Sequence, residues 1–541
     1  MIKQRFLILF LLLMAGLAAC TGTTFSEPTP IPPPPTNDSD TNPPVAATNT
    51  PDPIAEATDT AVDPTPTLVA TATPTAEIVA TAVTNPPVQV VNSQPLPASS
   101  RDLLFLADGA FKQWSHATSQ VETIVPGPNP ASRMPADDIW PAEGFVGDVT
   151  AFSMSADGKR AVVARLLNKQ ASSSDEGSLV ETSQELLFVD MISGEMWTLV
   201  PQVDNLGDFQ LSPDAQQLAF TGTGLDGIPD AGTNPPDADS GVPLPNNLYV
   251  MSTGGGNPGL VRLVRDCTSR CLWPVWHGES NLVAFTDNEA LWLYNIAANE
   301  PEILLVNTPF YSGMADVSQI SIYSPIAWAK NGRYLLLWNG GWESASRAVL
   351  DVPTKAFAAI PNSLVYADPF PSEISWMPDD RLLIWRTEHT NNSIVPLAEL
   401  WRFNPANEEL VKEESTVLST LPLGVLGGTT LENGRFAFAL NSSPADLDNE
   451  TAVAAAGTYQ LVSLAETPER VNTLPPSEAA SWQSQVYWAK DGSGAILVQQ
   501  PRQFETTVFY APTDGDFLYE ITAVLGQNAH AFQWQPEIII P

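Results

Sequence analysis

The residues of this chain whose types and spacing could do chemistry are few, and the densest group is acidic. The candidate ligands are Asp226, Asp230, Asp237 and Asp239, in a stretch that also contains glycine. Alternating carboxylates near glycine can wrap a Ca²⁺ ion with oxygen ligands. The stretch lacks EF-hand spacing and has no Glu at its end, so a solvated acidic loop is the competing interpretation. Ca²⁺ is the one cofactor for which the sequence offers a candidate site; otherwise we expect none.

A pair of cysteines forms the second group. Cys267 and Cys271 are separated by three residues, and Cys20 lies in an N-terminal segment described below. If the chain is secreted, its cysteines meet an oxidising setting in which disulfides form. We predict a local disulfide, with free thiols as the alternative, and its short loop places its stabilisation near the low end of about 2–4 kcal/mol. The pair has no paired histidines nearby, which argues against a zinc site.

Signatures of catalysis are missing from the sequence. The four histidines, His116, His277, His389 and His530, are each isolated. There is no Gly-x-Ser-x-Gly elbow, no His-Glu-x-x-His pair and no phosphate-binding loop. We therefore assign no catalytic residue and favour a function other than that of an enzyme.

A repeated unit must position these residues. A strand, a tight turn at Asp or Asn that glycine often follows, and a second apolar strand recur along the chain, and two further strands come after them. The residues three positions before the turn are Met154, Leu211, Trp276, Trp328, Trp376, Thr430, Trp488 and Trp534. Asp and Asn suit this turn because their side chains cap nearby N–H groups, and glycine supplies a positive φ. Four strands per unit at a period of about 50 residues predict a β-propeller.

The two ends of the repeat predict how the ring closes. Ala531–Gln535 has the form of a first strand just before the chain stops, whereas Asp102–Leu106 has the form of a second strand without a first. We predict that the C-terminal strand joins the N-terminal blade, which removes two open sheet edges. The fold class is all-β: an eight-bladed β-propeller with four antiparallel strands per blade. A seven-bladed ring is the alternative, with the weak copy at Thr430 as the misassigned unit.

Two copies of the repeat carry a family resemblance. Phe209–Asp214 and Phe152–Lys159 resemble the Ser-Pro-Asp-Gly repeats of TolB-like β-propellers over roughly residues 101–541. Such propellers serve as periplasmic or surface binding platforms, and as accessory domains of some peptidases and polysaccharide lyases. The resemblance implies the fold, and it does not carry an activity with it. The stretch Asp226–Asp230 also resembles a fragment of thrombospondin type 3 calcium repeats, although Asn234–Pro236 replaces the next acidic step.

Residues 1–19 have the pattern of a secretion signal. Lys3 and Arg5 precede the apolar run Phe6–Met14. The segment ends at Leu17–Cys20, which resembles the lipobox of bacterial lipoproteins, and an ordinary signal with a chance cysteine is the alternative. In that family the chain is cut before the cysteine, which then carries acyl chains, and more than one chain is what stable anchoring needs. The resemblance implies lipidation at Cys20 and an extracytoplasmic chain of the bacterial cell envelope, anchored to the cell membrane or outer membrane.

Residues 20–100 read as the lipidated cysteine followed by a Pro/Thr-rich disordered tether. Thr21–Ser100 holds 17 prolines and eight acidic residues, with no Lys or Arg. Such a composition has too little apolar surface to fold and favours an extended, partly polyproline-like chain. The predicted organisation is a signal peptide over 1–19, a tether over 20–100 and a propeller over 101–541.

Net charge limits the partners. The formal net charge of the whole chain is −37, and residues 101–541 carry 22 Lys and Arg against 53 Asp and Glu. A nucleic acid or an anionic lipid surface would be repelled by this field. Cations, basic proteins and neutral glycans remain. We expect a monomer that touches the membrane through its lipid anchor only.

The connections indicate which face could bind. The links between second and third strands and between blades vary in length, and both kinds emerge on one side of the disc, where binding sites are usually displayed. We favour a non-catalytic binding or scaffold module for an envelope protein or glycan. A glycan-active lyase or glycosidase is one alternative, and it needs paired carboxylates about 5–9 Å apart. A quinone-dependent dehydrogenase is another, because Asp190–Trp197 resembles its tryptophan-docking phrase, although those enzymes repeat the phrase in most blades and place two adjacent cysteines under the cofactor.

Overall fold

A computed structural model gives the fold of the compact unit Val79–Pro541. It describes residues 89–92, 99–129, 144–171, 180–225, 246–254, 259–267, 270–310, 314, 316–341, 344–361, 363, 373–389, 394–418, 423–432, 434–442, 460–464, 468–473, 485–502, 505–512, 517–526 and 528–536. The signal segment, Cys20 and most of the predicted tether lie outside this set. No helix in the described ranges is long and apolar enough to cross a membrane.

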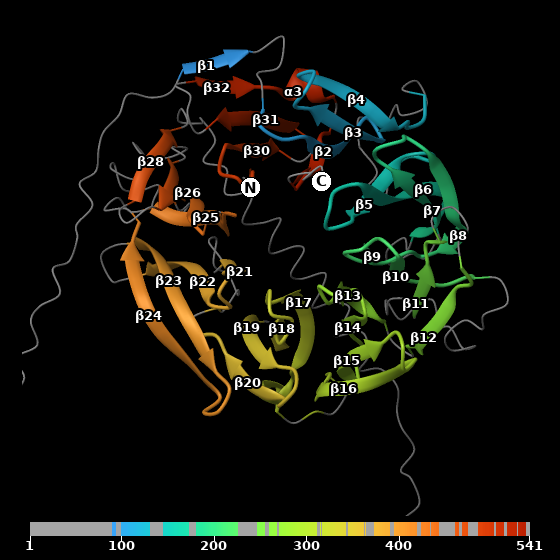
Figure 1. The fold of residues 1–541 in the computed structure, drawn as a ribbon, viewed down its shortest axis with the longest axis vertical. Helices are drawn as coiled ribbons and strands as arrows, with labels where there is room; N and C mark the ends of the chain where they lie inside the picture. The colour runs from blue at the N-terminus through green and yellow to red at the C-terminus, as the bar shows by residue number, and fades with distance from the viewer. Residues whose placement is uncertain are drawn as a thin grey trace, which may run out of the picture. The chain divides into compact units, whose positions relative to one another are not determined.

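The described strands form eight sheets, arranged as the blades of a propeller (Figure 1). Seven sheets have four antiparallel strands, and the eighth has four antiparallel strands and one added strand. Blade 1 is β33 (His530–Trp534), β2 (Leu103–Ala107), β3 (Ala110–Ser115) and β4 (Gln120–Val125). Blade 2 is β5 (Val149–Met154), β6 (Arg160–Ala171), β7 (Val180–Asp190) and β8 (Met196–Asp204). Blade 3 is β9 (Phe209–Leu211), β10 (Gln217–Gly222), β11 (Asn247–Ser252) and β12 (Arg262–Asp266). Blade 4 is β13 (Leu272–Trp276), β14 (Leu282–Thr286), β15 (Ala290–Asn295) and β16 (Glu300–Val306).

The second half of the ring follows the same order. Blade 5 is β17 (Ile322–Trp328), β18 (Tyr334–Gly341), β19 (Ser344–Asp351) and β20 (Ala356–Ala359). Blade 6 is β21 (Glu373–Trp376), β22 (Leu382–His389), β23 (Ile394–Asn404) and β24 (Glu409–Val417). Blade 7 is β25 (Leu423–Thr430), β26 (Phe436–Ser442), β27 (Gln460–Leu464) and β28 (Pro468–Thr473). Blade 8 is β29 (Gln485–Trp488), β30 (Gly494–Arg502), β31 (Glu505–Pro512) and β32 (Phe517–Glu520). The short helices are η6 (Val317–Gln319) and α3 (Thr522–Leu525). The weak copy at Thr430 is therefore a blade, and the prediction of eight blades is confirmed.

The chain ends close the ring as predicted. β33 pairs antiparallel with β2, so that Leu103 lies opposite Trp534 and Leu104 opposite Gln533. The N–H of Gln535 extends the pairing by donating to the carbonyl oxygen of Asp102 at 2.9 Å. The strand that begins the propeller and the strand that ends it therefore belong to one sheet.

A buried arginine reinforces this closure. Arg101, just before β2, donates from Nη1 and Nη2 to Glu432 at 2.8 and 2.6 Å, and from Nε to Asp491 at 3.0 Å. Glu432 and Asp491 lie in the first turns of blades 7 and 8. Burial by itself would raise the pKa of Asp491, but hydrogen bonds from Ser493 and Ser100 and the charge of Arg101 hold it below its ordinary value. The segment that leads into blade 1 is thus tied to the two blades that precede it in the ring.

The hydrophobic core is divided among the junctions between blades. In the described part of the chain the buried apolar residues form eight clusters, one at each junction. The apolar run Ala161–Ala164 of β6 shows why the second strands are apolar throughout. Successive side chains of a strand point to opposite faces, so Ala161 and Val163 pack at the junction with blade 1, and Val162 and Ala164 at the junction with blade 3.

The tryptophans of the repeat fix the register of neighbouring blades. Their indole N–H groups donate to a carbonyl oxygen on the innermost strand of the preceding blade: Trp276 to Gln210 at 2.8 Å, Trp328 to Val275 at 3.3 Å, Trp376 to Ala327 at 3.1 Å and Trp534 to Tyr487 at 2.8 Å. Blade 7 departs from this series. Thr430 stands in the tryptophan position and donates through Oγ1 to Trp376 O at 3.3 Å, and the buried Nε1 of Trp488 in the next blade has no hydrogen-bond partner.

The predicted loop face agrees with the pairing at the ends of the strands. Asp204 at the end of β8 and Thr223 just after β10 exchange two backbone hydrogen bonds, of 2.9 and 2.8 Å. The blade-to-blade link and the second-to-third strand link therefore start at the same side of the ring. Much of these links, including the acidic stretch, lies outside the described residues.

One short segment of the predicted tether is a strand. β1 (Gln89–Asn92) pairs in parallel with β32, with Gln89 opposite Phe517 and Asn92 opposite Glu520, and so adds a fifth strand to the outer edge of blade 8. Unlike the stretches around it, this segment contains no proline, so its N–H groups can join a ladder. A strand at these four residues was not predicted from the sequence.

Trp276→Phe and Trp488→Phe test the indole hydrogen bonds against each other. Both residues are nearly buried, and the substitution removes the same apolar area from each. Only Trp276 loses a hydrogen bond, so we expect Trp276→Phe to lower the free energy of unfolding by about 1 kcal/mol more than Trp488→Phe. Urea unfolding of the two variants measures the difference, and equal losses would show that the indole bonds add no net stability.

Candidate functional site

The innermost strands of several blades are interrupted by β-bulges. The ladder register shifts within β5, β13, β17, β25 and β33. A bulge adds a residue to one strand and re-aims its side chain, and bulges are common beside functional sites. In β13 the shift falls at Trp273 and Pro274, and in β17 it falls at Ile326. Trp273 is 44% exposed and Ile326 is 39% exposed, although both lie on innermost strands.

Trp273 has the most unusual backbone of these residues. Its φ is +50°, in the left-handed region that bulky side chains rarely adopt. The N–H of Trp273 donates to Oδ2 of Asp208 at 3.0 Å, which holds the strained residue against the start of β9 in the neighbouring blade. Strain of this kind persists only where the surroundings enforce it, and it concentrates at binding and active sites.

A cavity of about 710 Å³ opens beside these residues. Most of its wall comes from the innermost strands of five consecutive blades, β33, β5, β9, β13 and β17, and the residue before β9; β18 contributes Trp338. Four of the innermost strands, β5, β9, β13 and β17, are labelled around the centre of the ring in Figure 1. The apolar lining residues are Phe152, Met154, Phe209, Trp273, Pro274, Val275, Pro325, Ile326 and Trp338, and the polar ones are Ser153, Asp208, Gln210, Ser324 and Gln533. A mostly apolar cavity of this size with a few polar groups is typical of a small-molecule site. We call it the channel cavity.

The polar groups of the channel cavity differ in how they are engaged. Gln210 is held in place, because its Oε1 accepts the backbone N–H of Trp276 at 2.9 Å. Ser324 is 1% exposed, and its Oγ has no hydrogen-bond partner among the described residues. This oxygen is not accessible from the cavity, so it belongs to the wall and not to the binding surface. Gln533 is exposed at the cavity wall. Asp208 is the one charged residue among the described residues of the lining.

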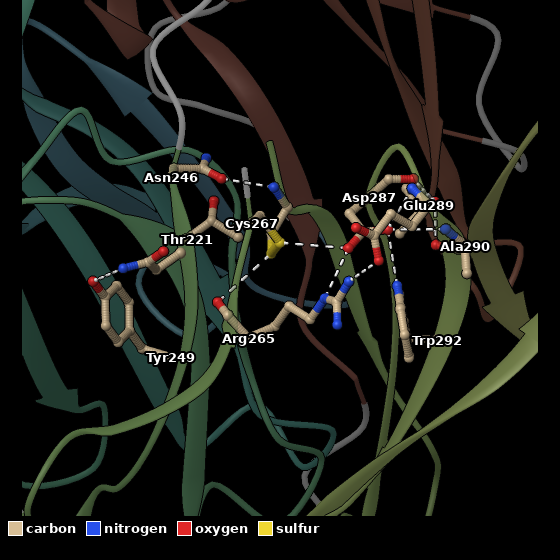
Figure 2. The surroundings of a disulfide bond; sticks show 12 residues. Thr221, Asn246, Tyr249, Arg265, Cys267, Asp287, Glu289, Ala290 and Trp292 are labelled. Carbon is tan, nitrogen blue, oxygen red and sulfur yellow. Dashed lines mark hydrogen bonds and ion pairs between the residues drawn. A yellow bond between two sulfur atoms is a disulfide. The ribbon is translucent and has the colours of Figure 1, made fainter. Parts of the chain in front are cut away.

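A disulfide anchors the chain just before Trp273. Cys267 and Cys271 are joined by a disulfide, with their Cα atoms 5.7 Å apart, and both are buried at the junction of blades 3 and 4. The N–H of Cys271 also donates to Oδ1 of Asn246 at 2.7 Å, as Figure 2 shows. Cys271, two residues before Trp273, is therefore held both by the disulfide and by its hydrogen bond to Asn246. Neither cysteine lines the channel cavity, so the pair does not lie beneath a ligand as the adjacent cysteines of quinone-dependent dehydrogenases do.

A network of charged groups surrounds the disulfide (Figure 2). Arg265 of β12 forms ion pairs with Asp287, at 2.9 Å, and with Glu289, and its guanidinium lies 4.0 Å from the ring centroid of Trp292. Oδ1 of Asp287 accepts the indole N–H of Trp292 and the backbone N–H of Ala290, each at 2.9 Å. This network joins the outermost strand of blade 3 to blade 4 and stiffens the junction from which Trp273 projects.

The other residues singled out by the sequence are not gathered here. Cys20, Asp226, Asp230, Asp237 and Asp239 lie outside the described residues, and those that are described contain no group of three or more potential metal ligands.

The histidines are scattered. His116 is paired with Asp102 at 2.5 Å on the surface, His277 is nearly buried with Nε2 at 3.2 Å from Gly332 O, and His530 contacts Asn528 O at 2.6 Å. The side chain of His389 is outside the described set. None of the three described histidines lines the channel cavity.

Trp273, Asp208 and Ser324 were missed by sequence reasoning. Each lies three or four residues before a repeat position, namely Trp276, Leu211 and Trp328, where the pattern predicts ordinary strand. A signal was present at Trp273, since the proline that follows it is a residue that strands tolerate only at a sheet edge, at their first residue or at a bulge. Nothing in the sequence distinguishes Ser324 from the other serines of the repeats.

No family model and no curated protein matches the sequence. Among solved structures, the chain is similar to TolB from Acinetobacter baumannii, with 13% identity, a TM-score of 0.29, and coverage of 70% of this chain and 83% of that one. It is similar to dipeptidyl peptidase 4 of Porphyromonas gingivalis, with 10% identity, a TM-score of 0.45, and coverage of 80% and 60%. A structure from a study of two prolyl endopeptidases has 13% identity and a TM-score of 0.42, and the match covers 72% of this chain and 50% of that chain. These scores support no statement about function, and membership of the TolB-like family stays a prediction.

Replacing both Cys267 and Cys271 by serine tests the anchoring of the bulge. Because the loop is short, we expect the free energy of unfolding to fall by about 2 kcal/mol. We also expect faster amide hydrogen exchange over residues 270–276, since one of the two contacts that hold Cys271 is lost. Exchange in β14 of the same blade is the control and should not change. Unchanged exchange over 270–276 would contradict a positioning role for the disulfide.

Proposed function

We propose that this chain is a lipid-anchored, extracytoplasmic binding module that captures an envelope protein or a glycan. In this proposal Cys20 holds the chain at a membrane, the tether carries the propeller away from the surface, and the partner reaches the channel cavity from one face of the ring. The chain acts as a monomer and binds no nucleic acid.

The observation that carries the proposal is the channel cavity with Trp273 in its wall. A large, exposed aromatic side chain on a strained and doubly anchored backbone adds nothing to the core of the fold. Its position favours contact with a ligand, since aromatic side chains are enriched at the energetic centres of interfaces.

A glycan-active enzyme is less well supported by the same cavity. Glycoside hydrolysis in most families uses two carboxyl groups that flank the bond. The described lining of the channel cavity contains one carboxylate, Asp208, which is engaged by the N–H of Trp273. Binding of a glycan by aromatic and amide side chains needs no such pair, so a glycan remains within the proposal as a ligand.

Trp273→Leu tests the proposal through retention of a partner. We expect the immobilised full-length protein to retain a component of envelope extract, and the variant to retain at least about tenfold less, as for an aromatic residue at an interface centre. Ile192→Ala is the matched control, because Ile192 is a 71% exposed apolar residue of an outer turn. Retention is measured by quantitative mass spectrometry of the eluates, with and without Ca²⁺.

Two results would count against this function. Retention by Trp273→Leu equal to that of the control would place binding away from the channel cavity. Turnover of a glycan by the purified protein without retention of any partner would contradict a binding module altogether.

Cys20→Ser tests the anchor separately. A chain with no acyl groups and no other anchor loses stable membrane attachment, so we expect the variant to move from the membrane pellet to the soluble fraction after cell disruption. Immunoblots of the two fractions measure the shift. A variant that stays in the pellet after a high-salt wash would show that lipid at Cys20 is not what holds the protein there.

A further inference from the structure

Charge is distributed unevenly between the inside and the outside of the ring. The eight innermost strands contain a single acidic residue, Glu373, and no Lys or Arg, in a chain with a formal net charge of −37. Asp208, at the start of β9, therefore sets the charge of the channel cavity. The carboxylate of Asp208 accepts the neutral N–H of Trp273, and no Lys or Arg belongs to the described lining.

The aromatic side chains of the cavity are not equivalent. Trp338 is already covered by a cation, because the guanidinium of Arg347 lies 4.0 Å from its ring centroid. Trp273 is the large aromatic side chain of the cavity that remains open to solvent, at 44% exposure. The indole ring is the best of the aromatic faces for binding a cation. The hydrogen bond from the backbone N–H of Trp273 places the carboxylate of Asp208 next to the backbone of the residue that carries this ring.

We propose that the channel cavity is a site for an organic cation, an ammonium or guanidinium group carried on an apolar body, with its charge between the indole of Trp273 and the carboxylate of Asp208. This inference rests on the proposed binding function and names its ligand class. The apolar walls at Ile326 and Pro274 receive the body of the ligand. The exposed amide of Gln533 supplies a hydrogen bond to any polar group beyond it.

Asp208 and the net negative charge of the whole chain both favour a cation over a neutral sugar as the ligand. A sugar would leave a carboxylate without a counter-charge in a partly enclosed cavity, where burying an uncompensated charge is costly. A cation removes that cost. The summed field of an acidic protein also raises the local concentration of cations in a cleft and repels anions. The same cation can belong to a free amine or to a basic side chain of a partner protein, and the experiment separates the two sources.

Calorimetric titration of the full-length protein with matched probes tests the inference. The protein is kept in a polyoxyethylene detergent, which carries neither a sugar nor a cation. Choline is compared with 3,3-dimethyl-1-butanol, which has the same shape without the charge. Nα-acetyl-lysine N-methylamide is compared with its Nε-acetylated form, which represents the side-chain source. We expect each cation to bind at least about tenfold more tightly than its neutral counterpart, and increasing salt to weaken the binding.

Variants of the two principal residues sharpen the test. Asp208→Asn keeps an oxygen that can accept the N–H of Trp273 and removes the charge, and we expect at least about a tenfold loss of cation affinity. Glu195→Gln, on an exposed outer turn, removes an equal charge and should leave the affinity unchanged. Trp273→Phe should weaken binding less than Trp273→Leu, because phenylalanine keeps an aromatic face. Circular dichroism and urea unfolding establish that each variant is folded.

The outcomes are distinct. Preference for choline over its neutral counterpart supports a small amine, and preference for the lysine probe supports a basic side chain of a partner. Equal binding of charged and neutral probes, or full affinity in Asp208→Asn, overturns the cation site. Binding of cellobiose that depends on Trp273 and not on Asp208 also overturns it and assigns the cavity to neutral glycans. If no probe binds, the cation site is wrong, and the retention experiment still decides separately whether the chain is a binding module.

Discussion

Closure of the ring is the constraint on which the rest of this structure depends. β33 supplies the strand that blade 1 lacks, and Arg101 ties the start of the propeller to Glu432 and Asp491 in the two preceding blades. Without this pairing, blades 1 and 8 would each expose a face that is now buried in a shared cluster around Leu103, Trp114, Tyr510 and Trp534. Among the described residues, each buried apolar cluster joins two neighbouring blades, and no cluster spans the centre of the ring. A cavity with walls from β33 and β17 exists only because the chain returns to its starting point.

The junctions also explain why the centre of the ring can carry a site. Both faces of each blade are used for packing, as the alternation of Ala161 and Val162 between two clusters shows. Each innermost strand forms one edge of its sheet, and along that edge it has no neighbouring strand. The bulged residues Trp273 and Ile326 line the channel cavity and belong to none of the buried clusters between blades. The disulfide and the Arg265 network add rigidity at the one junction where the bulged residue is largest.

The fold could be predicted because its four-strand unit repeats along the sequence. The residues of the site could not, because they lie where individual units depart from the repeat. The tryptophan positions, the Asp-Gly turns and the two incomplete ends were enough to predict eight blades and their closure. Gly492 and Gly332 have the positive φ expected of these turns. Trp273 could not be found in this way, because its orientation follows from how residues of β13 pair with β14. β1 was missed because a four-residue strand depends on the free edge of β32, which is about 400 residues away in the sequence. Cys20 and the acidic stretch remain predictions.

The fifth strand of blade 8 also determines where a mechanical load would fall. Any pull on the chain upstream of Gln89 reaches the four residue pairs of β1 and β32 before it reaches Leu103. These pairs lie at the rim, outside the sheet that closes the ring. Because only four residue pairs hold β1, we expect them to separate first under such a load and to lengthen the chain while β33 stays paired with β2.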